Sequence, residues 1–282
     1  MMKNNIYSLI LLSLWVLLQF QGCANEEETS QEELTLTFHL TSGETHIHCG
    51  SSFELSGRES AFWLKDFRMY VHDVELLNSK QQWIPFKMTA DQEWSDGQIT
   101  LLDFEDGSNN CSESGTLFMN HAIQGKIKED TYSALRFKVG VPFAANHQDV
   151  TTAPAPLNQS NMFWVWQRGY KFARIELMEE SQESESPDDE MMNTSFTPWF
   201  FHLGSTGCNS AAATTAPSEE CQRANVAQYT VHQFDPHQQH ILIDVNTMLQ
   251  GVDLQLNTTE TPNGCMSMPI EEECSPILRL YN

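Results

Sequence analysis

The sequence predicts an all-β fold, a single β-sandwich-like domain with short helices and disulfide-tied loops. Many short segments are rich in β-branched and aromatic residues, or alternate between apolar and polar residues, which is typical of strands. Turn-forming residues separate these segments, as in sandwich-like and barrel-like folds. The chain has 282 residues, of which 40% are hydrophobic, so its length allows one large β domain or two small ones.

The individual strands can be placed from their residue patterns. The segment from Leu34 to Leu40 alternates most clearly, with apolar residues at every second position. The expected strands are residues 34–40, 67–77, 98–104, 116–127, 133–141, 170–178, 196–203, 226–234 and 240–245. The acid-rich segment 179–190 is expected to be a solvated loop. Asn246 can cap a short helix that runs through Leu249.

Residues 157–169 fit two interpretations. A short helix would be closed by Gly169, since glycine commonly follows the last turn. A strand would instead place Met162, Trp164 and Trp166 on one face, because side chains alternate along a strand. The sequence leaves both interpretations open.

The N-terminus predicts a bacterial lipoprotein signal. Lys3 supplies a basic start, residues 9–20 are largely apolar, and the small residue Gly22 precedes Cys23, which would carry the lipid. A plain secretory signal is the alternative. Ala24 after the cysteine is not an acidic retention signal, so we expect an outer-membrane lipoprotein of the cell envelope. The chain then divides into a signal peptide, an acidic tether and a folded domain at residues 1–22, 23–33 and 34–282.

The cysteine count agrees with export. Six cysteines remain after Cys23, and an even number in an exported chain favours disulfides. Several pairings are possible. Short loops favour Cys208–Cys221 and Cys265–Cys274, which leaves Cys49–Cys111.

Charge and motifs exclude some classes of protein. The formal net charge is −23, which argues against nucleic acid as a partner because its phosphates require cationic side chains. The sequence contains no H-E-x-x-H, G-x-S-x-G, G-x-G-x-x-G or P-loop motif. We therefore expect a binding protein and not an enzyme, with a hydrolase that uses unrecognised acidic residues as an alternative.

Soft metal ligands are frequent. The chain has 10 histidines and 12 methionines, and imidazole and thioether groups suit Cu(I). His46 and His48 stand beside Cys49 and either form a chelate or lie in a polar loop.

Aromatic residues concentrate in segment 162–172, which favours a core, a cofactor wall or a sugar-stacking platform. A carbohydrate-binding surface lipoprotein is therefore an alternative function. Its stacking residues would be Trp164, Trp166, Tyr170 and Trp199.

Several motifs occur together in one order. They are residues 66–74 (DFRMYVHDV), 102–107 (LDFEDG), 139–143 (VGVPF), 146–149 (NHQD), 156–158 (PLN), 162–167 (MFWVWQ), 169–172 (GYKF), 202–208 (HLGSTGC) and 264–267 (GCMS), with Cys274 after the last. On these motifs the sequence resembles the MbnP-like family, named for a protein of methanobactin operons and also called metallo-mystery pair four-Cys motif proteins. The resemblance spans about Leu34 to the C-terminus.

This resemblance implies a periplasm-facing copper protein that takes part in copper homeostasis. Its partner would be a diheme c-type cytochrome of the peroxidase/MauG type. In the family, that partner oxidises the first tryptophan of a W-x-W motif to kynurenine, at a Cu(I) site built from histidine and methionine. The matching residues here are Trp164, which would be modified, and Trp166.

The ligands that would complete such a site are expected near Trp164. We favour His147 because it stands in the N-H-x-D motif shortly before Trp164, with Asp149 orienting its second nitrogen. We favour Met162 as the thioether because it is close in sequence. His147 alternatively only organises the 142–156 loop. Alternative ligands are His39 and His202 for the imidazole and Met266 for the thioether.

Overall fold

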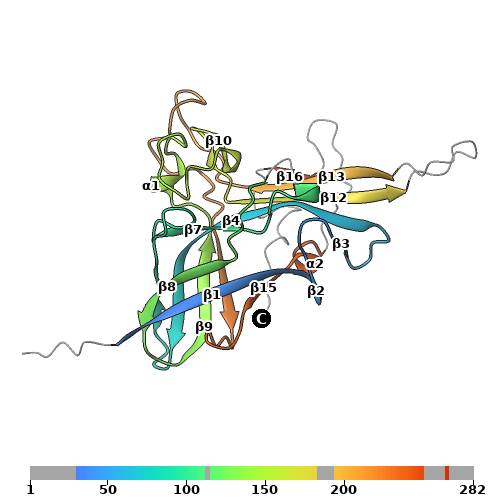
Figure 1. Cartoon of the computed structure of the whole chain (residues 1–282). Helices are drawn as coiled ribbons and strands as arrows, with labels where there is room; N and C mark the ends of the chain where they lie inside the picture. Colours follow the sequence, from blue (N-terminus) through green and yellow to red (C-terminus); the bar gives the residue numbers. More distant parts are fainter. Residues whose placement is uncertain (1–29, 112–114, 183–193, 251–263, 267–282) are drawn as a thin grey trace, which may run out of the picture. The chain divides into compact units, whose positions relative to one another are not determined.

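The computed structural model describes residues 30–111, 115–182 and 194–250, together with the backbone of residues 264–266 (Figure 1). The expected signal peptide, the expected lipidation site Cys23 and the expected disulfide Cys265–Cys274 lie outside the residues whose side chains are described. Within those ranges, no helix is long and apolar enough to cross a membrane.

Strands dominate the described chain, and its helices are single turns. The strands are β1 (Gln31–Ser42), β2 (Thr45–His46), β3 (Ser52–Glu54), β4 (Ala61–Asn78), β5 (Trp83–Pro85), β6 (Lys87–Met88), β7 (Ile99–Asp103), β8 (Ala122–Lys128), β9 (Tyr132–Val139), β10 (Phe163–Val165), β11 (Gly169–Tyr170), β12 (Ala173–Gln182), β13 (Thr194–Leu203), β14 (Ala227–His232), β15 (Ile241–Asp244) and β16 (Gly264–Met266). The helical turns are η1 (Asn109–Cys111), α1 (Phe143–Asn146), η2 (Ser160–Met162) and α2 (Val245–Met248). This composition confirms the all-β fold predicted from the sequence.

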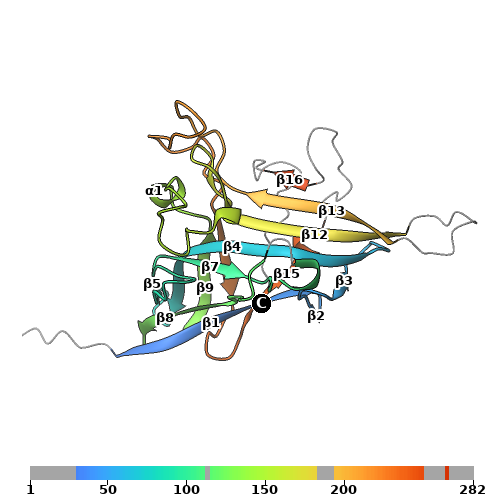
Figure 2. The same cartoon turned by 45° about the horizontal axis from the view of Figure 1, so that its top comes forward.

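The strands form two main sheets and a separate hairpin. The 9-stranded sheet follows the path β14-β9-β4-β12-β13-β16, with β3, β5 and β7 also paired to β4. The 5-stranded sheet follows the path β15-β1-β8-β6, with β2 paired to β1, and β10 pairs with β11. Because β4 has 18 residues, its first part pairs with β12 and its second part with β9. Figure 2 shows β12 between β4 and β13.

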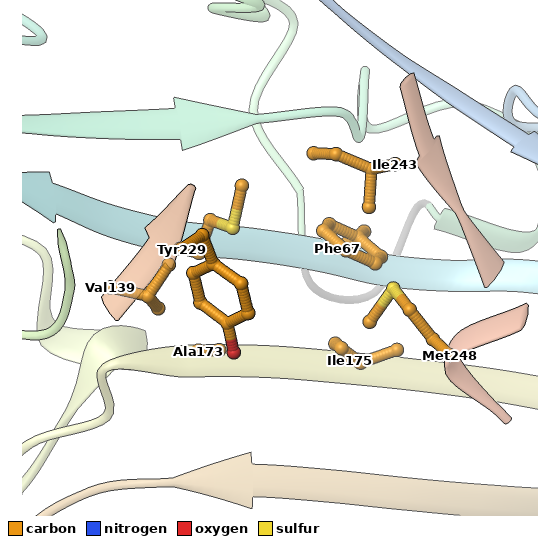
Figure 3. A pocket seen from close by; sticks show the side chains of 8 residues that line it. Phe67, Val139, Ala173, Ile175, Tyr229, Ile243 and Met248 are labelled. Atoms are coloured by element: carbon orange, nitrogen blue, oxygen red, sulfur yellow. The ribbon is translucent and has the colours of Figure 1, made fainter. Parts of the chain in front are cut away.

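The core lies between side chains of the two sheets. Figure 3 shows Phe67 and Ile175 of the larger sheet near Ile243 of β15 and Met248 of α2. All four side chains are buried. The space that they enclose with their neighbours is about 10 Å³, which is barely enough for one water molecule. The core is therefore filled by side chains.

Several strand boundaries differ from the sequence-based expectation, and β4 begins at Ala61 and not at Phe67. β8 begins at Ala122 and not at residue 116, because the apolar residues that suggested the earlier start, Leu117 and Phe118, are exposed. β12 continues to Gln182, into the segment expected to be a solvated loop. Glu179 and Glu180 pair with β13 there, and their side chains stay half-buried at the surface, so their charges do not oppose the ladder.

The ends of the domain show smaller differences. β1 begins at Gln31, inside the segment expected to be a tether. The N-cap of α2 is Asp244 and not Asn246, since the Asp244 side chain accepts a hydrogen bond from the Asn246 backbone N–H. The Asn246 side-chain oxygen instead accepts from the backbone N–H of Ser56 at 2.7 Å.

The disulfides Cys49–Cys111 and Cys208–Cys221 are present, which confirms these two pairings. The first attaches the chain after β2 to η1, and the second closes a loop after β13.

Candidate metal centre

The W-x-W segment forms a tight hairpin, and neither earlier interpretation describes it fully. Met162 ends the short turn η2, Trp164 lies in β10, and Trp166 lies in the turn before β11. Both tryptophans are half-buried, whereas Met162 is fully buried in the core. The hairpin returns through Gly169, whose φ of +75° suits glycine, and an added Cβ there would lie 2.4 Å from the carbonyl oxygen of Asn146.

Asn146 fastens this hairpin to the chain that follows β13. Its side-chain oxygen accepts a hydrogen bond from the Tyr170 backbone N–H at 2.8 Å. Its side-chain nitrogen donates to the Ser205 hydroxyl, also at 2.8 Å. Asn146 is buried, so both hydrogen bonds are shielded from water. Segments about 60 residues apart are thereby held together.

His147, the favoured imidazole ligand, already has partners on both ring nitrogens. Nδ1 lies 2.9 Å from the Trp166 carbonyl oxygen, so the imidazole donates from this nitrogen. Nε2 lies 3.2 Å from the Asn146 side-chain nitrogen and 3.7 Å from Sγ of Cys221. Burial lowers the pKa of His147, which favours this neutral form. The geometry agrees with a residue that organises the loop and the hairpin.

The surroundings of His147 differ from the expectation for Asp149 and include two cysteines. The Asp149 carboxylate accepts hydrogen bonds from the backbone N–H and hydroxyl of Thr151, and it does not orient His147 in the described structure. The imidazole lies within 4.8 Å of both Cys208 and Cys221, but their sulfurs are joined in a disulfide. Metal coordination by thiolates is therefore not available at this cluster in the oxidised protein.

Trp164 packs against the chain immediately after β13. A Cβ added to Gly204 would lie 2.4 Å from Cζ3 of the Trp164 ring, so the ring can approach only because residue 204 is glycine. Positions two apart in an extended chain face the same way, which places Gly204 on the side to which His202 points. The hairpin thus brings Trp164 toward the end of β13 that carries His202.

His202 has the geometry of a prepared metal ligand. Its Nε2 lies 2.8 Å from a carboxylate oxygen of Glu176 on the neighbouring strand β12, so the neutral ring donates from Nε2. Its Nδ1 is buried and has no hydrogen-bond partner among the described residues. Burial lowers the pKa of His202, which leaves a lone pair on Nδ1 near neutral pH. A ligating histidine commonly has its other nitrogen held by a carboxylate in this way.

Glu176 is itself fixed in the charged state. Burial alone would raise its pKa, but hydrogen bonds from His202 and Arg174 outweigh burial and lower the pKa to about 2. Arg174 Nε lies 2.7 Å from the Glu176 carboxylate and 3.2 Å from Asp66, which also forms a buried ion pair with Arg68. This network of buried charges holds the carboxylate that in turn sets the His202 tautomer.

The backbone register places Met266, an alternative thioether, beside His202. β13 and β16 are parallel, and His202 is the register partner of Met266. Register partners of His202 continue across the sheet through strands β12, β4 and β7 and form one row. Its other members are Arg174, Arg68 and Asp103.

The remaining candidate ligands and stacking residues lie on the other sheet or are buried. His39 belongs to the smaller sheet, where it contacts His46 and His240. Tyr170 and Trp199, two residues of the expected sugar-stacking platform, are buried, with exposed fractions of 0% and 2%. They cannot stack on a sugar ring from solvent, so the platform loses half of its expected members.

Sequence reasoning missed Glu176, although the strand patterns contained a signal for it. Two largely apolar strands each carry charged residues at alternating positions. These residues are Asp66 and Arg68 in β4 and Arg174 and Glu176 in β12. Charges in such positions are rare unless they are paired, and they commonly mark a site.

Together, the fold and the site define an all-β protein in which a tryptophan hairpin is fastened to the chain just after the strand that carries a carboxylate-supported histidine. The chain belongs to the MbnP family, because the family model for MbnP matches residues 31–267. A solved structure, MbnP from Methylosinus trichosporium, is similar with a TM-score of 0.65 and 28% sequence identity, covering 84% of this chain and 83% of that chain. No curated protein sequence matches.

Proposed function

We propose that this protein is a copper-binding protein that holds Cu(I) through His202 and Met266, beside Trp164 in its kynurenine form. The observation that carries this proposal is the buried Nδ1 of His202, which has no partner among the described residues while Nε2 is held by Glu176. An unpaired buried nitrogen costs free energy in the absence of a ligand, so its retention supports a site that a ligand completes.

The donor set suits Cu(I). A neutral imidazole and a thioether are soft, uncharged ligands, which match a soft monovalent ion better than carboxylates would. His202 and Met266 are far apart in sequence, but they are register partners on adjacent parallel strands. Both could therefore bind one ion. We prefer this pair to His147 and Met162. Both ring nitrogens of His147 already have hydrogen-bond partners, and the Met162 side chain is buried in the core.

The half-buried position of Trp164 supports its oxidation by a partner enzyme. The ring is half-buried and packs on Gly204 at the edge of the site, so a large diheme partner could oxidise it by electron transfer without enclosing it. Cleavage of the indole C2–C3 bond, with oxygen from water and four electrons removed by the diheme enzyme, would give N-formylkynurenine. Hydrolysis would then release the formyl carbon as formate and leave kynurenine. The product offers an aryl amine and a ketone, two polar groups that can approach a metal. Trp166, in the adjoining turn, would relay charge between partner and site.

We infer that the protein acts in copper homeostasis as a lipoprotein and that it binds copper without catalysing a reaction. The sequence around Cys23 supports a lipid anchor in the outer membrane, facing the periplasm. Disulfides in the folded domain support an oxidising compartment. A fixed anchor would suit a sensor, store or chaperone.

The test is the copper content of three variants purified from the native host, where the diheme partner is present. His202→Gln should lose its Cu(I), whereas His147→Gln should keep it if the hairpin stays folded. His232→Gln, which changes an exposed histidine on β14, is the matched control. Mass spectrometry of Trp164 in each variant separates loss of a ligand from loss of maturation. Copper retained by His202→Gln but lost from His147→Gln would reject this ligand assignment.

A further inference from the structure

A group of histidines lies outside the proposed Cu(I) site, on the smaller sheet. We name His39, His46 and His240 the histidine cluster. Nε2 of His39 lies 2.7 Å from Nδ1 of His240, with ring centroids 4.9 Å apart. The His46 ring contacts His39 edge-on, with centroids 5.2 Å apart. His121 is also near enough to affect the charge of His39.

The strand register explains why these rings meet. His39 is on the outward side of β1, between the buried Phe38 and Leu40. His46 of β2 is opposite Thr41, so its side chain shares a face with His39. His240 precedes β15 and lies two residues before Leu242, the register partner of His39. The three rings are therefore neighbours on one face, from three adjacent segments, two of which are about 200 residues apart in sequence.

His39 and His240 direct ring nitrogens at each other, and a rotation of the exposed His46 side chain would bring a third nitrogen to the pair. His39 is half-buried, and the other two are exposed. Burial, followed by the neighbouring His240, His46 and His121, lowers the pKa of His39, which favours a neutral ring. In the pair at 2.7 Å, one neutral ring donates and the other accepts. If the proton of the donor ring moves to its other nitrogen, both facing nitrogens carry a lone pair and both rings stay neutral.

We propose that the histidine cluster is a second metal site, which takes a divalent first-row ion such as Zn²⁺ or Cu²⁺. Imidazole is a preferred ligand for these ions, and the cluster offers no sulfur that would select Cu(I). Metal–nitrogen distances of about 2.0–2.1 Å require the facing nitrogens to separate slightly from their hydrogen-bonded contact. Rotation of the exposed His240 and His46 side chains allows this change. The net charge of −23 also attracts cations to the surface.

This site is separate from the proposed Cu(I) site. The histidine cluster is carried by β1, β2 and the start of β15, whereas Trp164 and His202 are carried by β10 and β13. Figure 1 shows β2 well apart from β10. The two sites therefore differ in place, in ligand softness and in the ion that they would hold.

The test is calorimetric titration of Zn²⁺ into the full chain without a histidine tag, in wild type and in three variants. His46→Gln and His240→Gln should each weaken binding at this site at least about tenfold, since even supporting residues change metal affinity by about 10- to 100-fold. His232→Gln is the matched control and should bind as wild type does. Electron paramagnetic resonance with Cu²⁺ should show nitrogen coupling that diminishes in the same two variants.

A titration repeated in His202→Gln separates the histidine cluster from the proposed Cu(I) site. Zn²⁺ binding should persist in that background, whatever its copper content. Binding of equal affinity in wild type and in the doubly substituted His46→Gln/His240→Gln protein would overturn the proposal. Failure of correctly folded wild type to bind Zn²⁺ or Cu²⁺ would also overturn it.

Discussion

His202 and Glu176 form a hydrogen bond of 2.8 Å between adjacent strands, and this contact leaves the second nitrogen of His202 buried with no partner in the described part of the chain. The two residues share a face of the sheet because His202 is the register partner of Arg174, two positions before Glu176. The contact sets the tautomer of His202 and leaves a lone pair on Nδ1, the arrangement common among histidines that bind metals.

Glu176→Gln is expected to weaken Cu(I) binding by about 10- to 100-fold, because a neutral amide supports the imidazole less well than a carboxylate does. Competition against a Cu(I) chelator measures the change. Glu75→Gln is the matched control, since Glu75 pairs with Arg136 on the β4–β9 pair, away from His202. Equal copper affinity in both variants would mean that Glu176 does not support a ligand.

The same carboxylate predicts an acid-sensitive contribution to folding. The pKa of Glu176 is about 2 in the folded protein against an ordinary value of 4.5. A lowered carboxyl pKa stabilises the fold above pH 4.5, and this contribution disappears as the pH falls from 4.5 to 2. It is on the order of 3 kcal/mol at neutral pH. The difference in unfolding free energy between wild type and Glu176→Gln should therefore shrink over that interval, and a difference that does not change with pH would contradict this assignment.

Gly204→Ala should displace the Trp164 ring, because the new methyl group would lie 2.4 Å from Cζ3. We expect lower thermal stability, altered tryptophan fluorescence and less copper in the purified protein. The double variant Gly204→Ala/Trp164→Phe provides the control, since a smaller ring relieves part of the overlap. Strictly additive losses of stability in the double variant would show that the two residues do not interact.

The two disulfides should differ in their contribution to stability. In the chain-entropy relation, a loop of 62 residues gives about 4 kcal/mol and one of 13 residues about 3 kcal/mol. Cys49→Ala/Cys111→Ala should therefore lower the unfolding free energy more than Cys208→Ala/Cys221→Ala does. Denaturant unfolding of both variants measures this order, and the reverse order would show that local contacts such as His147 against Cys221 dominate.

Alternation was sufficient to predict most of the strands, because one face of each strand is buried in a shared core. The β1 segment is the clearest case, with its buried leucines and phenylalanine at every second position. Alternation did not reveal the extension of β12 through Glu179 and Glu180, since that pairing depends on backbone hydrogen bonds to β13. Such long-range pairing does not appear in local composition.

The site was predicted less completely than the fold. Proximity in sequence favoured His147 and Met162, but the hairpin packs Trp164 against Gly204, two residues after His202. This contact joins residues 40 positions apart in sequence, and no local pattern encodes it. The family motifs include both His202 and Met266, but only the strand register shows that they are neighbours on adjacent strands.

The most direct test of the account is tandem mass spectrometry of the peptide that contains Trp164, from protein purified out of its native host. The account predicts a mass increase of about 4 Da on Trp164, from the loss of one carbon and the gain of one oxygen, with Trp166 unchanged. An unmodified Trp164 in copper-replete cells that produce the diheme partner would contradict the proposed copper site.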